Sequence, residues 1–159
     1  MRTAKDQSEQ KAVDDVTKHG LHIIQVFESE ECPRFSYTVG LFETYRHPEV
    51  IIIGLKPELA QVLLNNMAYD IKLGKRFNPG EFHEDVLDDF PCYFGEVSKS
   101  EYRDYVGWDI WFYEGIDFPL LQCVYPTVRG KFVWDEDFPE DARWFCKLIT
   151  SPPSETYIN

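Results

Sequence analysis

Residues 34–55 read RFSYTVGLFETYRHPEVIIIGL, and this stretch decides the fold. In residues 34–41, aromatic or branched side chains alternate with small polar ones. Successive side chains of a strand point to opposite faces, so this alternation predicts a strand with one apolar face. Residues 50–55 are a continuous apolar run, which is typical of a central strand covered on both faces. We therefore expect two strands of one sheet.

The segment that follows predicts a helix over residues 57–73, packed on this sheet. Pro57 suits the first turn of a helix, and Gly74 suits its end. Between them, apolar residues recur at helical spacing: Leu59, Val62, Leu63, Met67 and Ile71.

Further from this centre, the patterns predict helices at 8–19 and 101–113 and strands at 21–27, 91–97 and 119–125. Residues 131–134 are expected to pair with the last strand as a hairpin, and residues 76–90 to be irregular. Strict alternation of strand and helix is absent, which favours an α+β fold: a mixed or mainly antiparallel sheet with helices packed on one side. We expect a flexible N-terminus at 1–7, one compact domain at 8–150 and a flexible tail at 151–159.

Charge and composition restrict the partners. The 159 residues carry a net charge of -12, and 16% of them are aromatic. Because a chain this acidic repels the phosphate backbone of DNA or RNA, we expect no nucleic-acid partner. The same charge would attract a basic protein partner, and aromatic side chains enrich interfaces as well as cores.

The termini and cysteines indicate a cytoplasmic protein. Residues 1–10 are polar and lack the apolar core of a secretory signal, and no apolar run is long enough to span a membrane. Four cysteines stand far apart in the sequence, without the paired spacing of a zinc site: Cys32, Cys92, Cys123 and Cys146. Reduced thiols in a cytoplasm are the simplest account of them.

Motifs for the common cofactors are missing, so no cofactor is predicted. The chain has no glycine-rich dinucleotide or phosphate loop, no G-x-S-x-G and no H-E-x-x-H. His19 and His22 have H-x-x-H spacing, but no third ligand follows nearby, so no metal site is predicted.

The strand at 34–41 leads into a candidate site. Ser36, Thr38 and Gly40 form a strip of small residues that another backbone or a ligand could approach closely. The following loop holds Glu43, Tyr45, His47 and Glu49, and such a set of acid, base and phenol could support acid–base chemistry. The alternative is a hydrogen-bonded turn with a structural histidine.

Another polar residue, Gln122, alternates with Leu120 and Val124 in the expected strand at 119–125 and so can face the core. A buried amide needs hydrogen-bond partners. Those partners would be either a ligand or other groups of the protein.

The run FSYTVGL at 35–41, followed by His47-Pro48-Glu49 and an apolar strand ending in Gly54, resembles a bacterial family known as domain of unknown function 4262. Arg76-Phe77, Pro79-Gly80-Glu81, Trp111-Phe112-Tyr113, Phe118-Pro119 and Leu121-Gln122 also match, so the resemblance covers roughly residues 19–135. Thr127 and Val133 depart from the family pattern, which has Asp and Pro there. The resemblance implies a compact bacterial cytoplasmic domain and implies no activity. Its pattern concentrates at 37–40, 47–49, Gln122 and Trp134.

Two functions are consistent with these observations. The first is a non-catalytic binding or interaction protein with a basic protein partner; toxin-neutralising, immunity-like proteins are one such class. The alternative is a small-molecule-binding protein or an enzyme with a pocket near Tyr37, Thr38, His47 and Gln122. The candidate pocket residues are Tyr37, Thr38, Gly40, Glu43, His47, Glu49, Gln122 and Trp134. The sequence sets neither the small molecule nor the oligomeric state.

Overall fold

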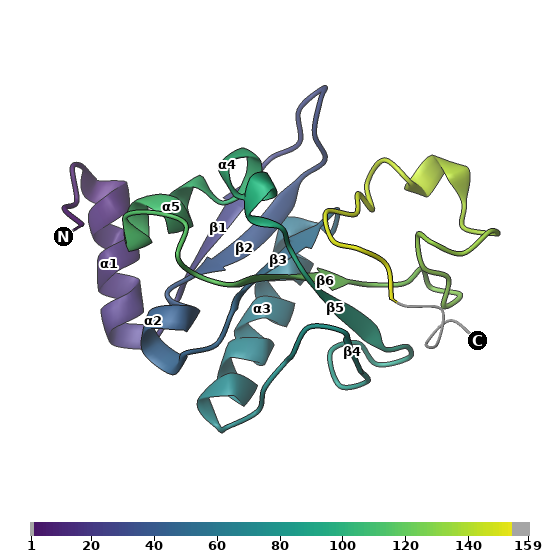
Figure 1. The fold of residues 1–159 in the computed structure, drawn as a ribbon, viewed down its shortest axis with the longest axis horizontal. Helices are drawn as coiled ribbons and strands as arrows, with labels where there is room; N and C mark the ends of the chain where they lie inside the picture. Colours follow the sequence, from purple (N-terminus) through teal and green to yellow (C-terminus); the bar gives the residue numbers. More distant parts are fainter. Residues whose placement is uncertain (1, 154–159) are drawn as a thin grey trace.

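A computed structural model describes residues 2–153 and shows a six-stranded sheet with helices around it (Figure 1). Of the expected tail at 151–159, residues 154–159 lie outside the described residues, as does residue 1 of the expected N-terminus. The helices are α1 (Gln7–His19), α2 (Leu41–Tyr45), α3 (Pro57–Lys72), α4 (Tyr102–Tyr105) and α5 (Gly107–Tyr113), with 3₁₀ turns η1 (Lys99–Glu101) and η2 (Glu140–Ala142). The strands are β1 (His22–Val26), β2 (Phe35–Val39), β3 (Glu49–Ile53), β4 (Glu81–His83), β5 (Cys92–Glu96) and β6 (Leu120–Val124).

The sheet has the strand order β1-β2-β3-β6-β5-β4, and only β3 and β6 run parallel among the described strands. It is therefore mixed and mainly antiparallel, which confirms the α+β prediction. Every residue of β2, β3 and β6 is buried. The apolar run at 50–55 is thus a central strand, as expected.

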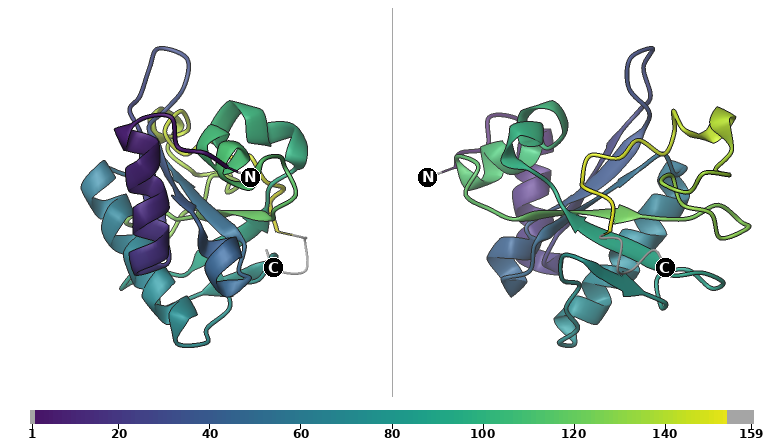
Figure 2. Two further views of the ribbon diagram at one scale, coloured as in Figure 1. Left: turned by 90° about the vertical axis from the view of Figure 1, so that its left-hand side faces the viewer. Right: turned by 45° about the vertical axis from the view of Figure 1, so that its right-hand side comes forward.

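Helices cover both faces of the sheet, so the expectation of helices on one side was wrong. Figure 2 shows α3 on one face and the α4–α5 pair on the other. Val50 and Ile52 pack with α3, whereas Ile51 and Ile53 pack with α4 and α5. A strand that is apolar on both sides needs cover on both sides, and this pattern was already present in the sequence.

The bounds of helix α3 confirm the helix predicted at 57–73. Of the apolar residues expected on its buried face, only some are buried. Leu63, Met67 and Ile71 face the core, together with Ala60, Leu64 and Ala68. Leu59 and Val62 are exposed instead. The helix therefore has apolar residues on two faces.

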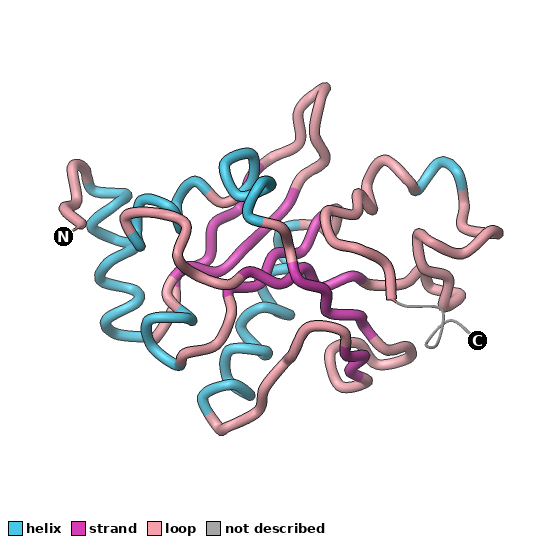
Figure 3. The backbone as a smooth tube through the Cα atoms, viewed as in Figure 1, coloured by secondary structure: helices cyan, strands magenta, loops and turns pink. Residues whose placement is uncertain are grey.

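Several local predictions were wrong because tertiary contacts decided them. The helix expected at 101–113 is broken at Val106, where the backbone leaves helical geometry between α4 and α5. Residues 131–134 form no strand; Figure 3 shows this region as loop and turn. Residues 41–45 form helix α2 where a loop was expected, and residues 76–90 include strand β4.

No helix within residues 2–153 combines the length and apolar character needed to cross a lipid bilayer.

The packing of α3 predicts unequal effects of two alanine substitutions on this helix. Leu63 is buried against the sheet, so Leu63→Ala should lower the free energy of unfolding by about 2–5 kcal/mol. Asn65 is exposed on the same helix and is the matched control: Asn65→Ala should change the free energy of unfolding by no more than about 0.5 kcal/mol. Urea denaturation measures both. Equal losses would show that α3 does not pack as described.

Candidate functional site

The carboxylate of Glu49, at the start of β3, lies fully buried among hydrogen-bond donors. The Thr38 hydroxyl donates to it over 2.8 Å, and the Tyr113 hydroxyl from α5 donates to its other oxygen. Three backbone N–H groups donate to it over 3.1 Å each: those of Gly40, Leu41 and Phe42. The Glu49 side chain therefore joins β2, β3, α2 and α5.

Local backbone geometry explains why Glu49 is needed there. Gly40 precedes α2 with φ 103°, a left-handed conformation that favours glycine, and it offers no side chain to cap the helix. A Cβ at Gly40 would also stand 2.7 Å from a methyl of Val16 in α1. The close approach expected at the strip of small residues is therefore made by α1, and Glu49 supplies the missing cap from the next strand.

A second buried carboxyl lies in α5. Asp109 is fully buried, and neither of its oxygens has a hydrogen-bond partner among the described residues. Burial and the charge of Glu49 raise the pKa of Asp109 well above its usual 3.8. Burial therefore favours the protonated, neutral form of Asp109 over its carboxylate. We call Thr38, Glu49, Asp109 and Tyr113 the carboxyl cluster.

Burial raises the pKa of Glu49 to about 7, against the opposing effect of its donors. All five groups around it donate hydrogen bonds, and this arrangement favours the ionised form. The cluster thus contains two buried carboxyls whose pKa values are both raised, that of Glu49 to about 7.

Tyr37 and Arg2 complete the surroundings of the cluster. The Tyr37 hydroxyl accepts from the Trp108 N–H over 3.1 Å, and burial followed by the charge of Asp109 raises the pKa of Tyr37. The guanidinium of Arg2 lies 3.6 Å from the centre of the Phe112 ring and donates to the Glu43 carboxylate over 2.8 Å. Glu43, although close in sequence, therefore lies at the surface beside α5 rather than in the cluster.

His47 lies apart from the carboxyl cluster. Its ring is fully buried; Nε2 accepts from the Phe77 N–H over 3.0 Å, so Nδ1 carries the proton and donates to the Pro48 carbonyl over 2.8 Å. Burial lowers the pKa of His47 to about 4, so it is neutral at physiological pH. Such a histidine holds the turn before β3 against the segment at Phe77.

Gln122 and Trp134 also lie elsewhere. The Gln122 amide donates to the Lys147 carbonyl and accepts from the Ile149 N–H, each over 2.8 Å, which holds the C-terminal segment on β6. Trp134 stacks on Phe132, with ring centres 4.8 Å apart, and contacts Tyr93 edge-on. Of the eight candidate residues, the structure brings together Thr38, Gly40 and Glu49, with Tyr37 adjacent.

Asp109 and Tyr113 were missed from the sequence, although a signal for Asp109 existed. It stands four residues after Tyr105 and three before Phe112, so helical spacing already placed this acid on an apolar face. Nothing near Tyr113 in the sequence indicated Glu49, because 64 residues separate the two.

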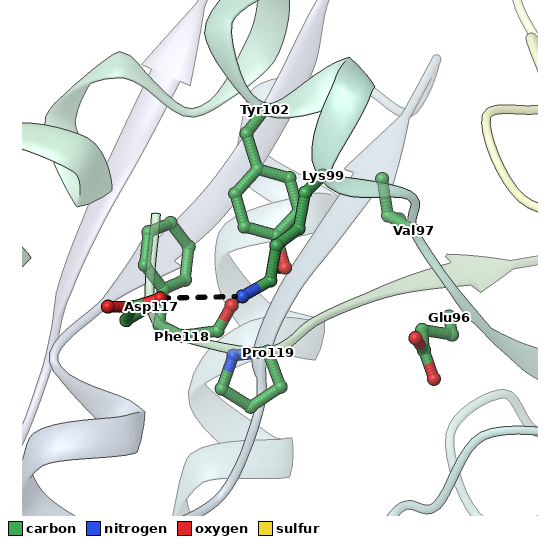
Figure 4. Close-up of a pocket in the computed structure, with 7 residues that line it drawn as sticks. All are labelled: Glu96, Val97, Lys99, Tyr102, Asp117, Phe118 and Pro119. Atoms are coloured by element: carbon green, nitrogen blue, oxygen red, sulfur yellow. Dashed lines mark hydrogen bonds and ion pairs between the residues drawn. The ribbon is translucent and has the colours of Figure 1, made fainter. Parts of the chain in front are cut away.

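Three surface cavities have volumes of about 400–440 Å³, and neither carboxyl of the cluster lines any of them. Figure 4 shows the cavity of about 420 Å³, lined by Glu96, Val97, Lys99, Tyr102, Asp117, Phe118 and Pro119. Its cation, Lys99, lies 3.8 Å from Asp117, and the Tyr102 hydroxyl donates to the Phe118 carbonyl. The polar groups of this cavity are thus largely occupied within the chain.

The cavity of about 440 Å³ is different because its wall is mainly apolar. We call it the acid-rimmed groove, and it is formed by Leu55, Leu59, Leu87, Asp88, Asp89, Phe90, Tyr125, Pro126, Thr127 and Val128. Asp88 and Asp89 are exposed. The groove offers apolar contact beside negative charge, which a basic amphipathic segment would fit.

Among residues 2–153, no three His, Cys, Asp or Glu side chains converge as a metal site would require. The carboxyl cluster, in turn, can hold and release a proton. Neither Glu49 nor Asp109 lines any of the three cavities of about 400–440 Å³ found among residues 2–153.

A protein-family model described as "Domain of unknown function (DUF4262)" matches residues 15–139, most of the chain. No curated protein and no solved structure matches.

The buried Asp109 predicts a stability difference that depends on pH. Its raised pKa means that the folded protein keeps a proton that the unfolded chain releases near pH 3.8, so this group lowers stability as pH rises. Asp109→Asn has no such proton to lose. Relative to the original protein, its free energy of unfolding should rise by more than about 1 kcal/mol between about pH 4 and pH 8, since one pKa unit corresponds to about 1.4 kcal/mol.

Thermal or urea unfolding across this pH range measures the difference. The matched control is Asp104→Asn on α4, where the side chain is exposed and the change should stay within about 0.5 kcal/mol at each pH. A pH-independent effect of Asp109→Asn would contradict the burial of an uncompensated carboxyl.

Tyr113→Phe should destabilise the protein by about 1–3 kcal/mol at pH 8, because it removes a donor from the ionised Glu49 and an acceptor from the Glu43 N–H. Tyr69→Phe, at an exposed position, is the control and should be near neutral. Denaturation of both variants under the same conditions measures this. Equal effects of the two would show that the Tyr113 hydroxyl does not support Glu49.

Proposed function

This chain belongs to the DUF4262 family, and from that premise we propose that it is a non-catalytic binding domain whose partner is a basic protein segment. The observation that carries the proposal is the acid-rimmed groove, which combines an apolar wall with exposed carboxylates. Neutralisation of a basic toxin in a bacterial cytoplasm is one form that such binding would take. The four free thiols of this chain suit a reducing compartment.

The size and apolar lining of the groove suit a few side chains of a partner rather than a broad, flat interface. The groove has a volume of about 440 Å³. Its apolar atoms come from five side chains: Leu55, Leu59, Leu87, Tyr125 and Val128. Val128 is almost completely exposed, so it is available to a partner. Burial of such side chains against a partner supplies the main favourable free energy of association.

Charge supports a basic partner. Asp88 and Asp89 form no ion pair within the described part of the chain, and both also line a smaller cavity of about 280 Å³ together with Glu84. The whole chain carries a net charge of -12. Long-range attraction would therefore raise the rate at which a cationic segment meets the groove, and salt would weaken it.

The surroundings of the four residues expected to line a pocket do not favour the alternative of an enzyme or a small-molecule site. Tyr37, Thr38, His47 and Gln122 are all buried, and each is hydrogen-bonded to other groups of this protein. A substrate could reach these four side chains only after a conformational change that exposes them. Binding at the groove requires no such change.

The test uses a fluorescently labelled amphipathic peptide of alternating leucine and lysine, with fluorescence anisotropy as the readout. We expect saturable binding that weakens with salt, and loss of on the order of tenfold in affinity for the double variant Asp88→Lys, Asp89→Lys. Val128→Asp should weaken binding as well, because it places a charge on the apolar wall.

A control variant with the same change of charge distinguishes the effect of the groove carboxylates on affinity from the effect of the net charge of the chain. Glu30→Lys with Glu31→Lys alters an exposed loop away from the groove and should leave the affinity nearly unchanged, apart from the smaller effect of net charge. Equal losses in the two double variants would reject the groove as the site. Comparable binding of a leucine–glutamate peptide or of duplex DNA would reject a basic partner.

A further inference from the structure

Helix α3 carries a second apolar face that the sheet does not cover. Leu59, Val62, Tyr69 and Leu73 are 44%, 53%, 62% and 68% exposed, whereas the opposite face of the helix is buried. Large apolar residues exposed singly are common on protein surfaces, but here three lie on one face of α3 and the fourth, Leu73, continues the same line at its C-cap.

The spacing of this patch is that of a seam between two helices. Residues 59, 62, 66, 69 and 73 are separated alternately by three and four positions, as are the a and d positions of a heptad repeat. We call Leu59, Val62, Asn66, Tyr69 and Leu73 the α3 seam. Asn66 is its central residue and its only polar one, and an asparagine at such a position restricts register and the number of helices that associate.

Charge beside the α3 seam is balanced, unlike that of the chain as a whole. The flanking residues Lys56, Glu58, Asp70 and Lys72 include two of each sign, whereas the full chain carries -12. Two copies of so acidic a protein repel each other over most of their surface. The α3 seam is a region where they can meet without that repulsion.

We propose that the α3 seam binds a second copy of this chain, with the two α3 helices antiparallel about a twofold axis near Asn66. Glu58 and Lys72 stand 14 residues apart on the same side of the seam. The antiparallel arrangement brings Glu58 of one copy to Lys72 of the other, and the twofold axis repeats this pair. A parallel arrangement would place residues of like charge at the same level.

A second copy fits as the partner because α3 itself carries both an acidic and a basic residue beside the seam, and these can pair between two copies. Glu58 and Lys72 form no ion pair within the described residues, so both are available. The seam runs nearly the whole length of the 16-residue helix, which is roughly 24 Å. Antiparallel packing also places the opposite ends of the two helix dipoles together.

The proposal concerns a surface other than the groove, and the two can be tested apart. Leu59 belongs to both surfaces, so it is left unchanged. Val62→Glu and Tyr69→Glu alter the α3 seam alone and should leave binding of the leucine–lysine peptide unchanged.

Sedimentation equilibrium over a range of protein concentrations measures the association. We expect the mass of two chains for the original protein and of one chain for Val62→Glu and Tyr69→Glu. Gln61→Glu is the matched control on the same helix: residue 61 lies outside the seam, and a carboxylate there can still accept from Gln25. It should remain dimeric. Circular dichroism and melting temperature verify that each variant is folded.

Charge reversal tests the orientation. Glu58→Lys and Lys72→Glu should each weaken the dimer on the order of tenfold, because each replaces two attractive pairs by two repulsive ones. The double variant restores the attraction and should regain most of the affinity. A monomer at every concentration would overturn the proposal, as would a dimer that Val62→Glu and Tyr69→Glu leave intact. A double variant weaker than both single ones would overturn the antiparallel arrangement.

Discussion

The hydrogen bonds to the buried carboxylate of Glu49 are the interaction on which the rest of this structure depends. This carboxylate accepts hydrogen bonds from the end of β2, from the first turn of α2 and from Tyr113 of α5, so four elements share one side chain. Each of these donors would be costly to bury without a partner. Glu49 satisfies them together, and in doing so it sets where α2 begins and how closely α5 approaches the sheet.

The same arrangement explains why a second acid can exist nearby. Asp109 lies buried without a hydrogen-bond partner among the described residues, and the charge of Glu49 makes its ionisation still less favourable. Glu49 and Asp109 thus form a pair of buried carboxyls in the core whose pKa values are both raised. Perturbed acids of this kind often mark active sites, but they also occur in structural networks. Glu49 and Asp109 line none of the three cavities of about 400–440 Å³ found among residues 2–153.

The two surfaces proposed to bind partners are mainly apolar. The acid-rimmed groove and the α3 seam meet at Leu59, so one helix would contribute to two different contacts. Its inner face packs on the sheet through Leu63, Leu64 and Met67, which keeps the outer face in a defined position. A rigid helix of this kind presents side chains with little loss of conformational freedom on binding.

The sequence by itself determined the central strands, the bounds of α3 and the α+β class, because these depend on the local periodicity of apolar residues. It also singled out Thr38, Gly40 and Glu49, which the structure brings together. It did not show that Asp109 and Tyr113 join them, that His47 holds Phe77, or that Gln122 holds the C-terminal segment, because those contacts link residues far apart in the chain. Only the tertiary structure decided whether each polar group faces a cavity or another part of the protein, since a hydrogen bond depends on distance in space and not on spacing in sequence.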